Sequence, residues 1–517
     1  IYNYQDLRSS FMARGHKFHG CSDTEVLLSG LLAEGTQFIP RLDGMFAFAY
    51  VEPGAKRLVL ARDIFGEKPL YYAQTADWFA FASELQALTI LPGFDAAIDQ
   101  HRIATYLALQ YLPAPLTIYK HAYKLPPGHA LTIGRDGQIC LERYFRFVAS
   151  SASLGKRGLD ERADELEHIV SATLKTRLLS DVPLGAFLSG GVDSSTVVAM
   201  ARRYSPHPIK TFSIGFEGSP DSEHVQARAM AAHLGTDHHD KLLQLDALDL
   251  GRHIARVLDE PNGDTSCLPT WILSRMTREH VTVALSGDGG DELFGGYGRY
   301  TRTLQEARES AGNELWRPSQ AYYSDRIMIF SDAALEKFIG PLPELTRELM
   351  ETLRLPLDRT EKPLLQRLRE TDIENYMPGA VLAKVDRMSM QHALEVRAPL
   401  LARPIADFAM RLAADDLCTP DHSKRVLKQL AARYIPREWL ERPKMGFGMP
   451  VRGWGGTALA TEVADLLLGS DCRLVAWIQP ENLRRFVEYH WQRPHTYQLW
   501  AVFVLELWLR NHVGFPG

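Results

Sequence analysis

The chain has 517 residues and a formal net charge of −5 at pH 7, with 45% hydrophobic and 23% charged residues. A chain of this length is too long for one ordinary hydrophobic core, so we expect at least two domains. The composition is that of an ordinary globular protein, and its mild negative charge without a basic block argues against nucleic acid as the main partner.

Cysteine spacing and hydropathy bear on the compartment. The five cysteines are scattered and no pair has CxxC spacing, which is typical of free thiols in a reducing compartment. No signal peptide opens the sequence, and the most apolar stretch, 499–509, contains Glu506 and is too short to span a bilayer. We therefore expect a soluble, cytoplasmic protein without a membrane partner, in which 499–509 is a buried amphipathic helix.

The first part of the chain, to about residue 145, has the pattern of short strands. Runs of β-branched and aromatic residues are separated by turns that carry Gly, Pro, Lys or Arg. Strands are predicted at 46–51, 58–61, 70–72 and 78–81, and a helix at about 23–32. The pattern is typical of an α+β domain built on a largely antiparallel sheet.

A small polar segment, 150–155, predicts a linker, and beyond it strands and helices alternate. Apolar residues on one face predict a helix over 166–178. Strands are then predicted at 184–188, 210–216 and 281–285, and helices at 195–202 and 223–234. This alternation predicts a parallel sheet covered by helices on both faces. Beyond about residue 300 the pattern is almost wholly helical, and these helices should cap the open edge of the sheet.

A glycine-rich loop joins the strand at 184–188 to the helix that follows. It comprises Ser189, Gly190, Gly191, Val192, Asp193, Ser194 and Ser195. Paired glycines let backbone N–H groups approach phosphate oxygens, and the helix N-terminus adds orphan N–H groups and the positive end of its dipole. Asp193 can hold a Mg²⁺ ion against the same phosphates. The loop therefore predicts a phosphate site.

The composition of this loop indicates which phosphates it holds. The phosphate loop of kinases ends in Gly-Lys-Ser/Thr, and its lysine contacts the terminal phosphates, whereas 189–195 contains no lysine. The loop is similar instead to that of the ATP pyrophosphatases, which hold the departing pyrophosphate while the α-phosphate is attacked. The alternative is a glycine turn before a helix N-cap, but the apolar strand before the loop and the helix after it favour the phosphate site.

A second glycine-rich segment, 286–296, follows the strand at 281–285. Parallel strands end at the same edge of their sheet, so we expect this segment to face the 189–195 loop. Its three carboxylates, Asp288, Asp291 and Glu292, would repel one another unless a cation lay among them. We predict Asp291 as a second metal ligand and Asp288 as a group near the reacting carboxylate, the alternative being an acidic surface turn.

With both loops in view, the chain resembles the glutamine-hydrolysing asparagine synthetases, and the resemblance covers nearly its whole length. In the second part, segments 384–390 and 394–399 match the family's helical segment beside the substrate, and 442–447 matches its catalytic-lysine loop. In the first part, segments 1–4, 22–26, 42–48 and 61–63 match the family's glutaminase domain. The combination of motifs is far more specific than any one of them.

The resemblance implies a fold and residue roles. It implies an α+β N-terminal domain of the N-terminal-nucleophile hydrolase type at 1–147, incomplete at its start. A linker at 148–160 and an α/β parallel-sheet ATP-pyrophosphatase domain with a helical C-terminal part at 161–517 follow. Leu188 and Ile214 would line the adenine pocket, Ser286 and Gly287 would contact ATP, and pyrophosphate would be held by Ser189, Gly190, Gly191, Asp193 and Ser194. Asp193 and Asp291 would bind Mg²⁺, Asp288 would be needed for the acyl-adenylate, Lys444 would stabilise the transition state, and Asp23 would bind the amino group of glutamine.

Two departures from the family pattern stand out. The family's glutaminase uses an N-terminal cysteine as nucleophile and its α-amino group as base, whereas this sequence opens at Ile1, inside a later strand of that domain. The nucleophile, an early arginine and an Asn-Gly-Glu oxyanion segment are missing, so we expect the chain as printed to use ammonia and not to hydrolyse glutamine. The family's aspartate after Pro-Phe/Leu-Leu is here Ala402, which bears on how closely the acceptor site copies an aspartate-specific one.

The leading hypothesis is asparagine synthesis: ATP activates aspartate as its acyl-adenylate, glutamine or ammonia supplies nitrogen, and AMP and pyrophosphate are released. Three alternatives stay open: amidation of another carboxylate in polysaccharide or natural-product assembly, ring closure like that of β-lactam synthetase, and a non-enzymatic interaction protein. The intact Asp23 and 62–63 region argues against the cyclase, and the intact loops argue against a scaffold. The expected partners are small molecules, with a homodimer as one candidate assembly.

Overall fold

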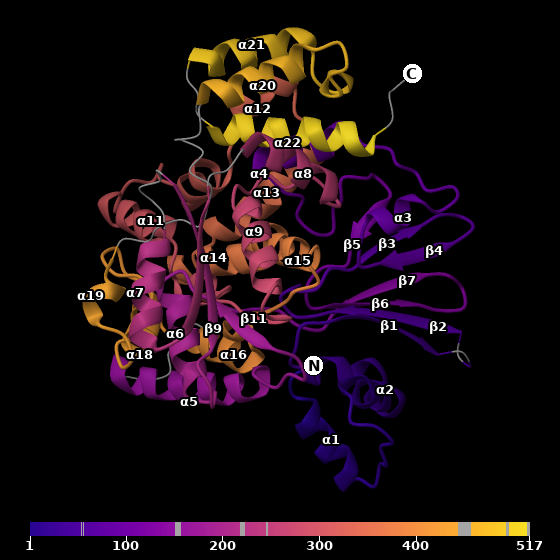
Figure 1. The fold of residues 1–517 in the computed structure, drawn as a ribbon. Coiled ribbons are helices and arrows are strands. Elements are labelled where there is room, and N and C mark those ends of the chain that lie inside the picture. The colour runs from indigo at the N-terminus through magenta and orange to yellow at the C-terminus, as the bar shows by residue number, and fades with distance from the viewer. Residues whose placement is uncertain are drawn as a thin grey trace.

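The computed structural model describes residues 1–517 apart from 53, 55, 150–156, 218–222, 244–246, 443–455, 493–495 and 514–517 (Figure 1). Its first part holds the helices α1 (Tyr4–Ala13), α2 (Asp23–Glu34), η1 (Gly35–Arg41), α3 (Gln86–Thr89) and α4 (Gln100–Leu109). Its strands are β1 (Ala47–Glu52), β2 (Arg57–Arg62), β3 (Tyr71–Gln74), β4 (Phe79–Ala82), β5 (Ala122–Lys124), β6 (His129–Ile133) and β7 (Ile139–Arg143).

These strands form two sheets, in the orders β1-β2-β6-β7 and β4-β3-β5. Every neighbouring pair in both sheets is antiparallel. The four strands predicted in this part correspond to β1, β2, β3 and β4, and the predicted helix corresponds to α2, whose first turn is capped by the Ser22 side chain accepting from the backbone N–H of Glu25. The predicted α+β pattern with largely antiparallel pairing is confirmed.

The expectation that the chain opens inside a strand is wrong. Residues 1–3 lead instead into α1, which buries Leu7 and Phe11, spaced four residues apart on one helical face. The backbone N–H of Tyr2 donates to the carbonyl of Asp43 at 2.7 Å, and the next residue already begins the turn into the helix. The helical spacing of these apolar residues determines the structure of the opening segment.

The second part is built on a parallel sheet. Its strands are β8 (Leu184–Phe187), β9 (Lys210–Phe216), β10 (Asp237–Leu243), β11 (Val283–Leu285) and β12 (Glu395–Arg397). Their order is β10-β9-β8-β11-β12, and every neighbouring pair is parallel. The connecting helices are α5 (Leu159–Arg177), α6 (Val192–Arg202), α7 (His224–Leu234), α8 (Ala247–Val257), α9 (Cys267–Arg278) and α10 (Gly290–Phe294). The predicted parallel sheet and its alternation with helices are confirmed.

One segment of this sheet was predicted wrongly. Segment 394–399 was expected to be helical, yet β12 pairs with β11 in parallel, Val283 opposite Glu395 and Leu285 opposite Arg397. The preceding helix α15 (Ala383–Met390) ends just before Ala393, whose φ of 53° breaks helical continuity. The β-branched Val396 then lies buried within a short strand, and Pro399 starts a new turn.

The remaining helices run from pink through orange to yellow in Figure 1, and the last of them form a layer at the top of that view. They are α11 (Gly298–Glu309), η2 (Ser319–Ile327), α12 (Asp332–Ile339), α13 (Glu344–Asp358), α14 (Leu364–Thr371), η3 (Asp372–Leu382), η4 (Pro399–Leu401), α16 (Arg403–Arg411), α17 (Ala414–Leu417), α18 (Arg425–Ala431), α19 (Arg437–Leu440), α20 (Gly456–Leu468), η5 (Leu474–Ala476), α21 (Pro480–Gln492) and α22 (Thr496–His512).

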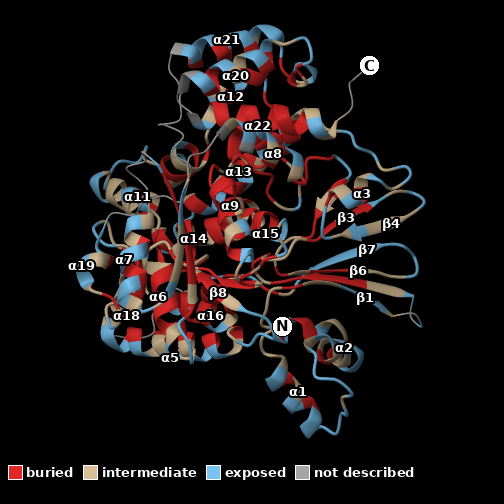
Figure 2. Ribbon diagram, viewed as in Figure 1, coloured by how far each residue is buried: buried red, intermediate tan, exposed pale blue. Residues whose placement is uncertain are grey.

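Helix α22 contains the most apolar segment of the chain, and Figure 2 shows it lined with buried residues. Every residue from Leu499 to Leu509 is buried. The prediction of a buried helix is confirmed, whereas the prediction that it is amphipathic is wrong, because this segment is buried on all sides. Glu506 is fully buried and accepts from the backbone N–H groups of Arg473 and Leu474 and from Arg510. Within the described ranges no helix is long and apolar enough to cross a membrane.

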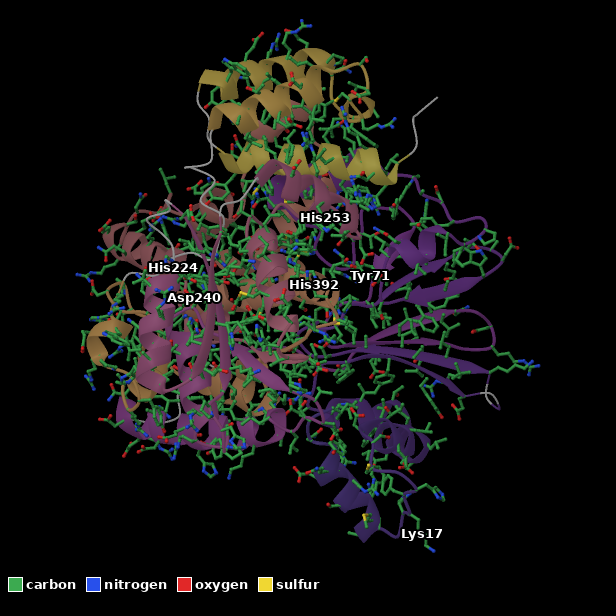
Figure 3. All side chains as sticks on the ribbon, in the orientation of Figure 1. Lys17, Tyr71, His224, Asp240, His253 and His392 are labelled. Carbon is green, nitrogen blue, oxygen red and sulfur yellow. The ribbon has the colours of Figure 1, made fainter. Side chains whose placement is uncertain are left out.

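The two parts share a hydrophobic core. One continuous cluster includes Tyr71 and Tyr106 of the first part together with Leu166 and Leu188 of the second. Figure 3 shows Tyr71 at the junction of the two parts, while Lys17 lies at the far tip of the α1–α2 hairpin. The sites carried by the two parts are therefore held together by packed side chains.

Candidate active site

The first glycine-rich loop follows β8 and leads into α6. The backbone N–H of Leu188 donates to the carbonyl of Phe212 on β9, and the hydroxyls of Ser189 and Ser194 lie 2.9 Å apart, so the loop closes on itself. Gly190 has a φ of 79°, and a Cβ there would lie 2.9 Å from the backbone of Gln226. Helix α6 begins three residues earlier than predicted, which makes Asp193 a residue of its first turn.

The second loop lies directly against the first. Strand β11 pairs with β8, so their carboxyl ends reach the same sheet edge. A Cβ on Gly287 would lie 2.7 Å from the backbone nitrogen of Ser194, and one on Gly290 would lie within 2.4 Å of the Asp193 carboxylate. The prediction that the two loops face each other is confirmed, and side chains at these glycines would force them apart.

Asp193 and Asp291 converge on a cation that sequence reasoning missed. The Lys424 ammonium is 2.8 Å from the Asp291 carboxylate and forms a shorter ion pair with that of Asp193. Burial alone would lower the pKa of Lys424, but the two carboxylates outweigh it and raise this pKa. Lys424 has a φ of 53° and precedes α18, far along the chain from either loop. The repulsion expected among the loop carboxylates was the only signal for such a cation.

The two carboxylates of Asp193 and Asp291 do not by themselves make up a set of metal ligands. Within the described residues, no group of three or more His, Cys, Asp and Glu side chains is placed to hold a metal. Asp193 and Asp291 already converge on one positive charge, so their arrangement fits a divalent cation that takes its other oxygen ligands from phosphates and water.

Asp288 lies in the second loop beside Ser286. Burial raises the pKa of Asp288, while the charge of Lys384 opposes this increase. Lys384 is on α15 and is mostly buried. The structure therefore places Asp288 near a buried ammonium, where both its charge and its proton can respond to a bound substrate.

Two predicted adenine-pocket residues are in the core. Leu188 is 1% exposed and Ile214 is 3% exposed, and they pack in different hydrophobic clusters. Leu188 directly follows β8, and Ile214 lies in the neighbouring strand β9. Neither side chain offers an open surface in this structure.

The first part places Asp23 at the start of α2. Its carboxylate is 42% exposed and lies 2.8 Å from the Ile1 ammonium, and although burial acts to raise its pKa, this ammonium lowers it. Arg62 and Asp63 are buried and bind backbone: Arg62 donates to three carbonyls, and Asp63 accepts from the N–H groups of the following turn. Arg62 and Asp63 therefore shape the turn at 63–68.

Lys444, predicted to stabilise the transition state, lies outside the described residues, in 443–455.

Ala402, where the family carries aspartate, is fully buried and is the residue before α16. Alanine is a poor N-cap, because it offers no acceptor to the orphan N–H groups of the first turn. Asp43 of the first part supplies that acceptor: its carboxylate accepts from the backbone N–H of Arg403 at 3.2 Å and pairs with Arg177. The departure at 402 thus concerns a helix cap at the junction of the two parts.

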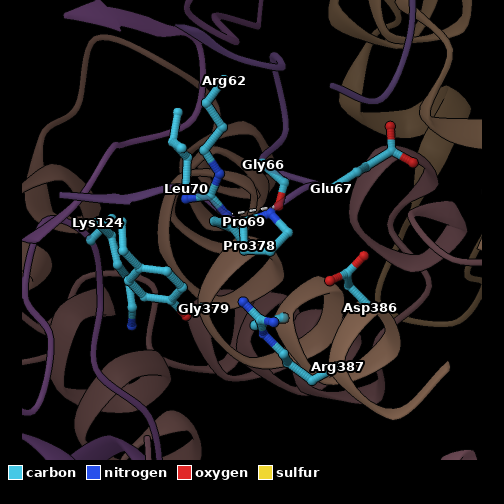
Figure 4. A pocket seen from close by; sticks show the side chains of 13 residues that line it. Arg62, Gly66, Glu67, Pro69, Leu70, Lys124, Pro378, Gly379, Asp386 and Arg387 are labelled. Atoms are coloured by element: carbon cyan, nitrogen blue, oxygen red, sulfur yellow. Dashed lines mark hydrogen bonds between the residues drawn. The ribbon is translucent and has the colours of Figure 1, made fainter. Parts of the chain in front are cut away.

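A narrow cavity lies between the two parts, lined by residues of both (Figure 4). Arg62, Glu67 and Lys124 line it from the first part, and Asp386 and Arg387 from the second. Ion pairs cross the junction beside it: Lys68 to Asp386 at 2.7 Å, and Lys124 to Glu260. Ion pairs as well as packed side chains therefore join the two parts beside this cavity.

Comparison with known proteins gives consistent matches. The family model described as asparagine synthase matches residues 165–510, and that described as glutamine amidotransferase domain matches residues 1–145. The glutamine-hydrolyzing asparagine synthetase 1 of Bacillus subtilis is 30% identical, over 98% of this chain and 84% of that protein. A putative glutamine-hydrolyzing asparagine synthetase of Mycobacterium tuberculosis is 33% identical, over 98% and 83%. A putative glutamine-hydrolyzing asparagine synthetase 2 of Methanocaldococcus jannaschii is 32% identical, over 75% of this chain and 80% of that protein.

Proposed function

This chain belongs to the asparagine synthetase family of ATP-dependent ligases, and we propose that it amidates aspartate to asparagine, releasing AMP and pyrophosphate. We assign the synthetase reaction to a domain at 161–517 and the amidotransferase role to a domain at 1–147, joined by a linker at 148–160. The observation that carries the proposal is the contact between the two glycine-rich loops, where Asp193 and Asp291 converge on one positive charge.

In the first step a carboxylate oxygen of aspartate attacks the α-phosphorus of ATP, the bond to the β-phosphate oxygen breaks, and pyrophosphate leaves. Ser189, Gly190, Gly191 and Ser194 would bind the leaving pyrophosphate through backbone N–H groups and hydroxyls at the N-terminus of α6. Leu188 and Ile214 would support the adenine through the strands that carry them, and Ser286 and Gly287 would contact ATP from the second loop.

Asp193 and Asp291 would hold Mg²⁺, which when bound neutralises charge on the departing pyrophosphate. Lys424 would then leave the carboxylates, and its ammonium is placed to bind the same phosphates. A lysine in the site does not contradict cleavage at the α-phosphate, because it enters from α18 and not from the loop itself.

In the second step ammonia attacks the acyl carbon, AMP leaves, and the nitrogen loses a proton. Asp288 would take that proton, because burial raises its pKa and makes it a stronger base than an exposed aspartate. Asp23, a partly exposed carboxylate at the start of α2, would bind the amino group of glutamine as the nitrogen donor.

We propose Lys444 as the group that stabilises charge on the acyl oxygen and the α-phosphate during this step. Removing one pre-organised charge of this kind typically costs about 10² to 10³ in rate. Lys444→Met should therefore slow turnover by about that factor with nearly unchanged ATP affinity, whereas turnover at the wild-type rate would refute the assignment.

The function is tested by measuring ATP products with a panel of carboxylic acids and ammonia. We expect AMP and pyrophosphate, with aspartate the best acceptor, and we expect Asp193→Ala to abolish turnover because it removes a ligand for the cation. Asp77→Asn, in an exposed turn, is the matched control. Formation of ADP and phosphate would contradict the proposal, and a different best acid would favour amidation of another carboxylate.

A further inference from the structure

A buried group of polar side chains beside Asp288 has no part in the steps above. It joins Lys384 on α15 to Asp264 and Ser266, which precede α9. The side chain of Lys384 is 10% exposed and that of Asp264 is 21% exposed. Both side chains are therefore largely buried, and Asp264 keeps part of its surface exposed.

The three side chains are connected in sequence. The Lys384 ammonium donates to the Ser266 hydroxyl at 2.7 Å and lies 3.3 Å from one oxygen of Asp264. The other oxygen of Asp264 accepts from the Ser266 hydroxyl at 2.6 Å and from its backbone N–H at 2.8 Å. An ammonium has three donors, and these two acceptors use two of them, so a third N–H can serve a ligand.

The charge of Lys384 reaches two carboxylates. Burial acts to raise the pKa of Asp264, but Lys384 and the hydrogen bonds from Ser266 outweigh it, and this carboxyl stays ionised. The same ammonium acts on Asp288 in the second loop. Burying an ion pair is costly compared with burying apolar side chains of similar volume. A contribution to folding stability therefore does not by itself explain why Lys384 and Asp264 are buried together.

The loop that carries Asp264 is fixed from the first part of the chain. The backbone N–H of Gly263 donates to the carbonyl of Gln110 at 2.8 Å, where Gln110 ends α4 with a φ of 67°. A Cβ at Gly263 would lie 3.0 Å from Gln110 and 3.1 Å from the Tyr106 hydroxyl. The cation and the anion are thus held at a fixed separation before any substrate arrives.

We propose that Lys384 binds the α-carboxylate and Asp264 the α-ammonium of an α-amino acid acceptor, leaving its side-chain carboxylate to reach ATP beside Asp288. A zwitterion supplies one charge of each sign at neighbouring atoms, which matches this pair, and each buried group gains an oppositely charged partner. The inference rests on the proposed function, because it names the groups that select the acceptor at that site.

The test compares three acids that differ by one charged group. Succinate lacks the amine of aspartate, and β-alanine lacks its α-carboxylate, while both keep the carboxylate to be activated. Calorimetric binding to the whole chain is measured with a non-reacting ATP analogue and Mg²⁺, and it does not depend on turnover. The wild-type protein should bind aspartate more tightly than either analogue by about 10- to 100-fold, the range for a charged hydrogen bond.

Each variant should remove one preference only. Lys384→Met should weaken aspartate binding by about 10- to 100-fold and leave β-alanine nearly unchanged, while Asp264→Asn should do the same for aspartate and leave succinate nearly unchanged. Lys17→Met, at the exposed tip of the first part, is the control. Affinity for the ATP analogue, measured on every variant, reports whether the site is still folded.

Three results would overturn the inference: no aspartate binding to the wild-type protein, equal weakening for all three acids in both variants, or loss of ATP-analogue binding in both. The last two would make the group a structural ion pair. Failure of the proposed function is distinguishable, because it would appear as ATP products other than AMP while the binding preferences remain.

Discussion

At the scale of single residues, the meeting of the two glycine-rich loops was predictable, because each loop follows a strand of the same parallel sheet. Asp193 and Asp291 stand in glycine-rich loops after strands, and the structure brings those loops into contact. Lys424 was not predictable, because it is a single lysine more than one hundred residues beyond the second loop and has no motif of its own. Its place between two carboxylates follows from tertiary folding alone.

The Lys424 ion pairs predict a metal-dependent stability. Lys424→Met leaves two carboxylates facing each other, so without metal we expect a loss of about 3–5 kcal/mol, the cost of breaking a buried pair. Mg²⁺ should restore most of this loss in the variant, because the ion replaces the missing cation. The measurement is urea unfolding with and without Mg²⁺.

Lys428→Met is the matched control. Lys428 lies on α18, one turn after Lys424, and pairs with the exposed Glu441, so its loss should change the free energy of unfolding by less than about 1 kcal/mol. An equal loss for Lys424→Met with and without Mg²⁺ would mean that the two carboxylates do not form a cation site.

At the scale of elements, strands and helices with a clear apolar period were predicted well, and exceptions have local causes. Segment 394–399 was assigned to a helix by resemblance to a neighbouring helical segment, but it completes the parallel sheet beside β11. Three strand residues carry too little periodicity to be recognised, and pairing with a partner far away in sequence decides their structure. Helix α22 has no polar face over 499–509, because Glu506 is the one charged residue there, and all of these side chains are buried.

The cap of α16 gives a prediction at this scale. Asp43→Ala removes the acceptor for the Arg403 N–H and the partner of Arg177, so we expect a loss of about 1–2 kcal/mol in the free energy of unfolding. Adding Ala402→Asp should recover about 1 kcal/mol, because the helix then carries its own N-cap. Chemical unfolding of both single variants and the double variant measures the coupling.

In the otherwise unchanged chain, Ala402→Asp should not raise the free energy of unfolding, because it places a second carboxylate beside that of Asp43. If the effects of the two substitutions were additive, the carboxylate of Asp43 would not be acting as the cap of this helix.

At the scale of the whole molecule, a division into two domains followed from chain length and from the change of pattern near residue 150, but the junction between them did not. Sequence patterns report periodicity within an element and say nothing about which surfaces meet. The junction instead depends on a shared hydrophobic core and on charges that pair across it, such as Lys68 with Asp386.

The Lys68–Asp386 pair predicts that the two parts unfold together. Lys68→Met leaves the mostly buried Asp386 without this partner, so we expect faster amide hydrogen exchange on both sides of the junction, in α15 and in the 63–68 turn. Lys17→Met should change neither. Faster exchange on only one side would show that this pair does not couple the two parts.

The central claim, an acyl-adenylate formed at the two loops, is tested most directly by isotope transfer. Aspartate labelled with ¹⁸O in its side-chain carboxylate is turned over with ATP, Mg²⁺ and ammonia, and the products are weighed by mass spectrometry. Attack of that carboxylate on the α-phosphorus predicts one ¹⁸O atom in each AMP, because the labelled oxygen leaves with the phosphate when nitrogen displaces it. Unlabelled AMP, or label in inorganic phosphate together with ADP, would contradict this account.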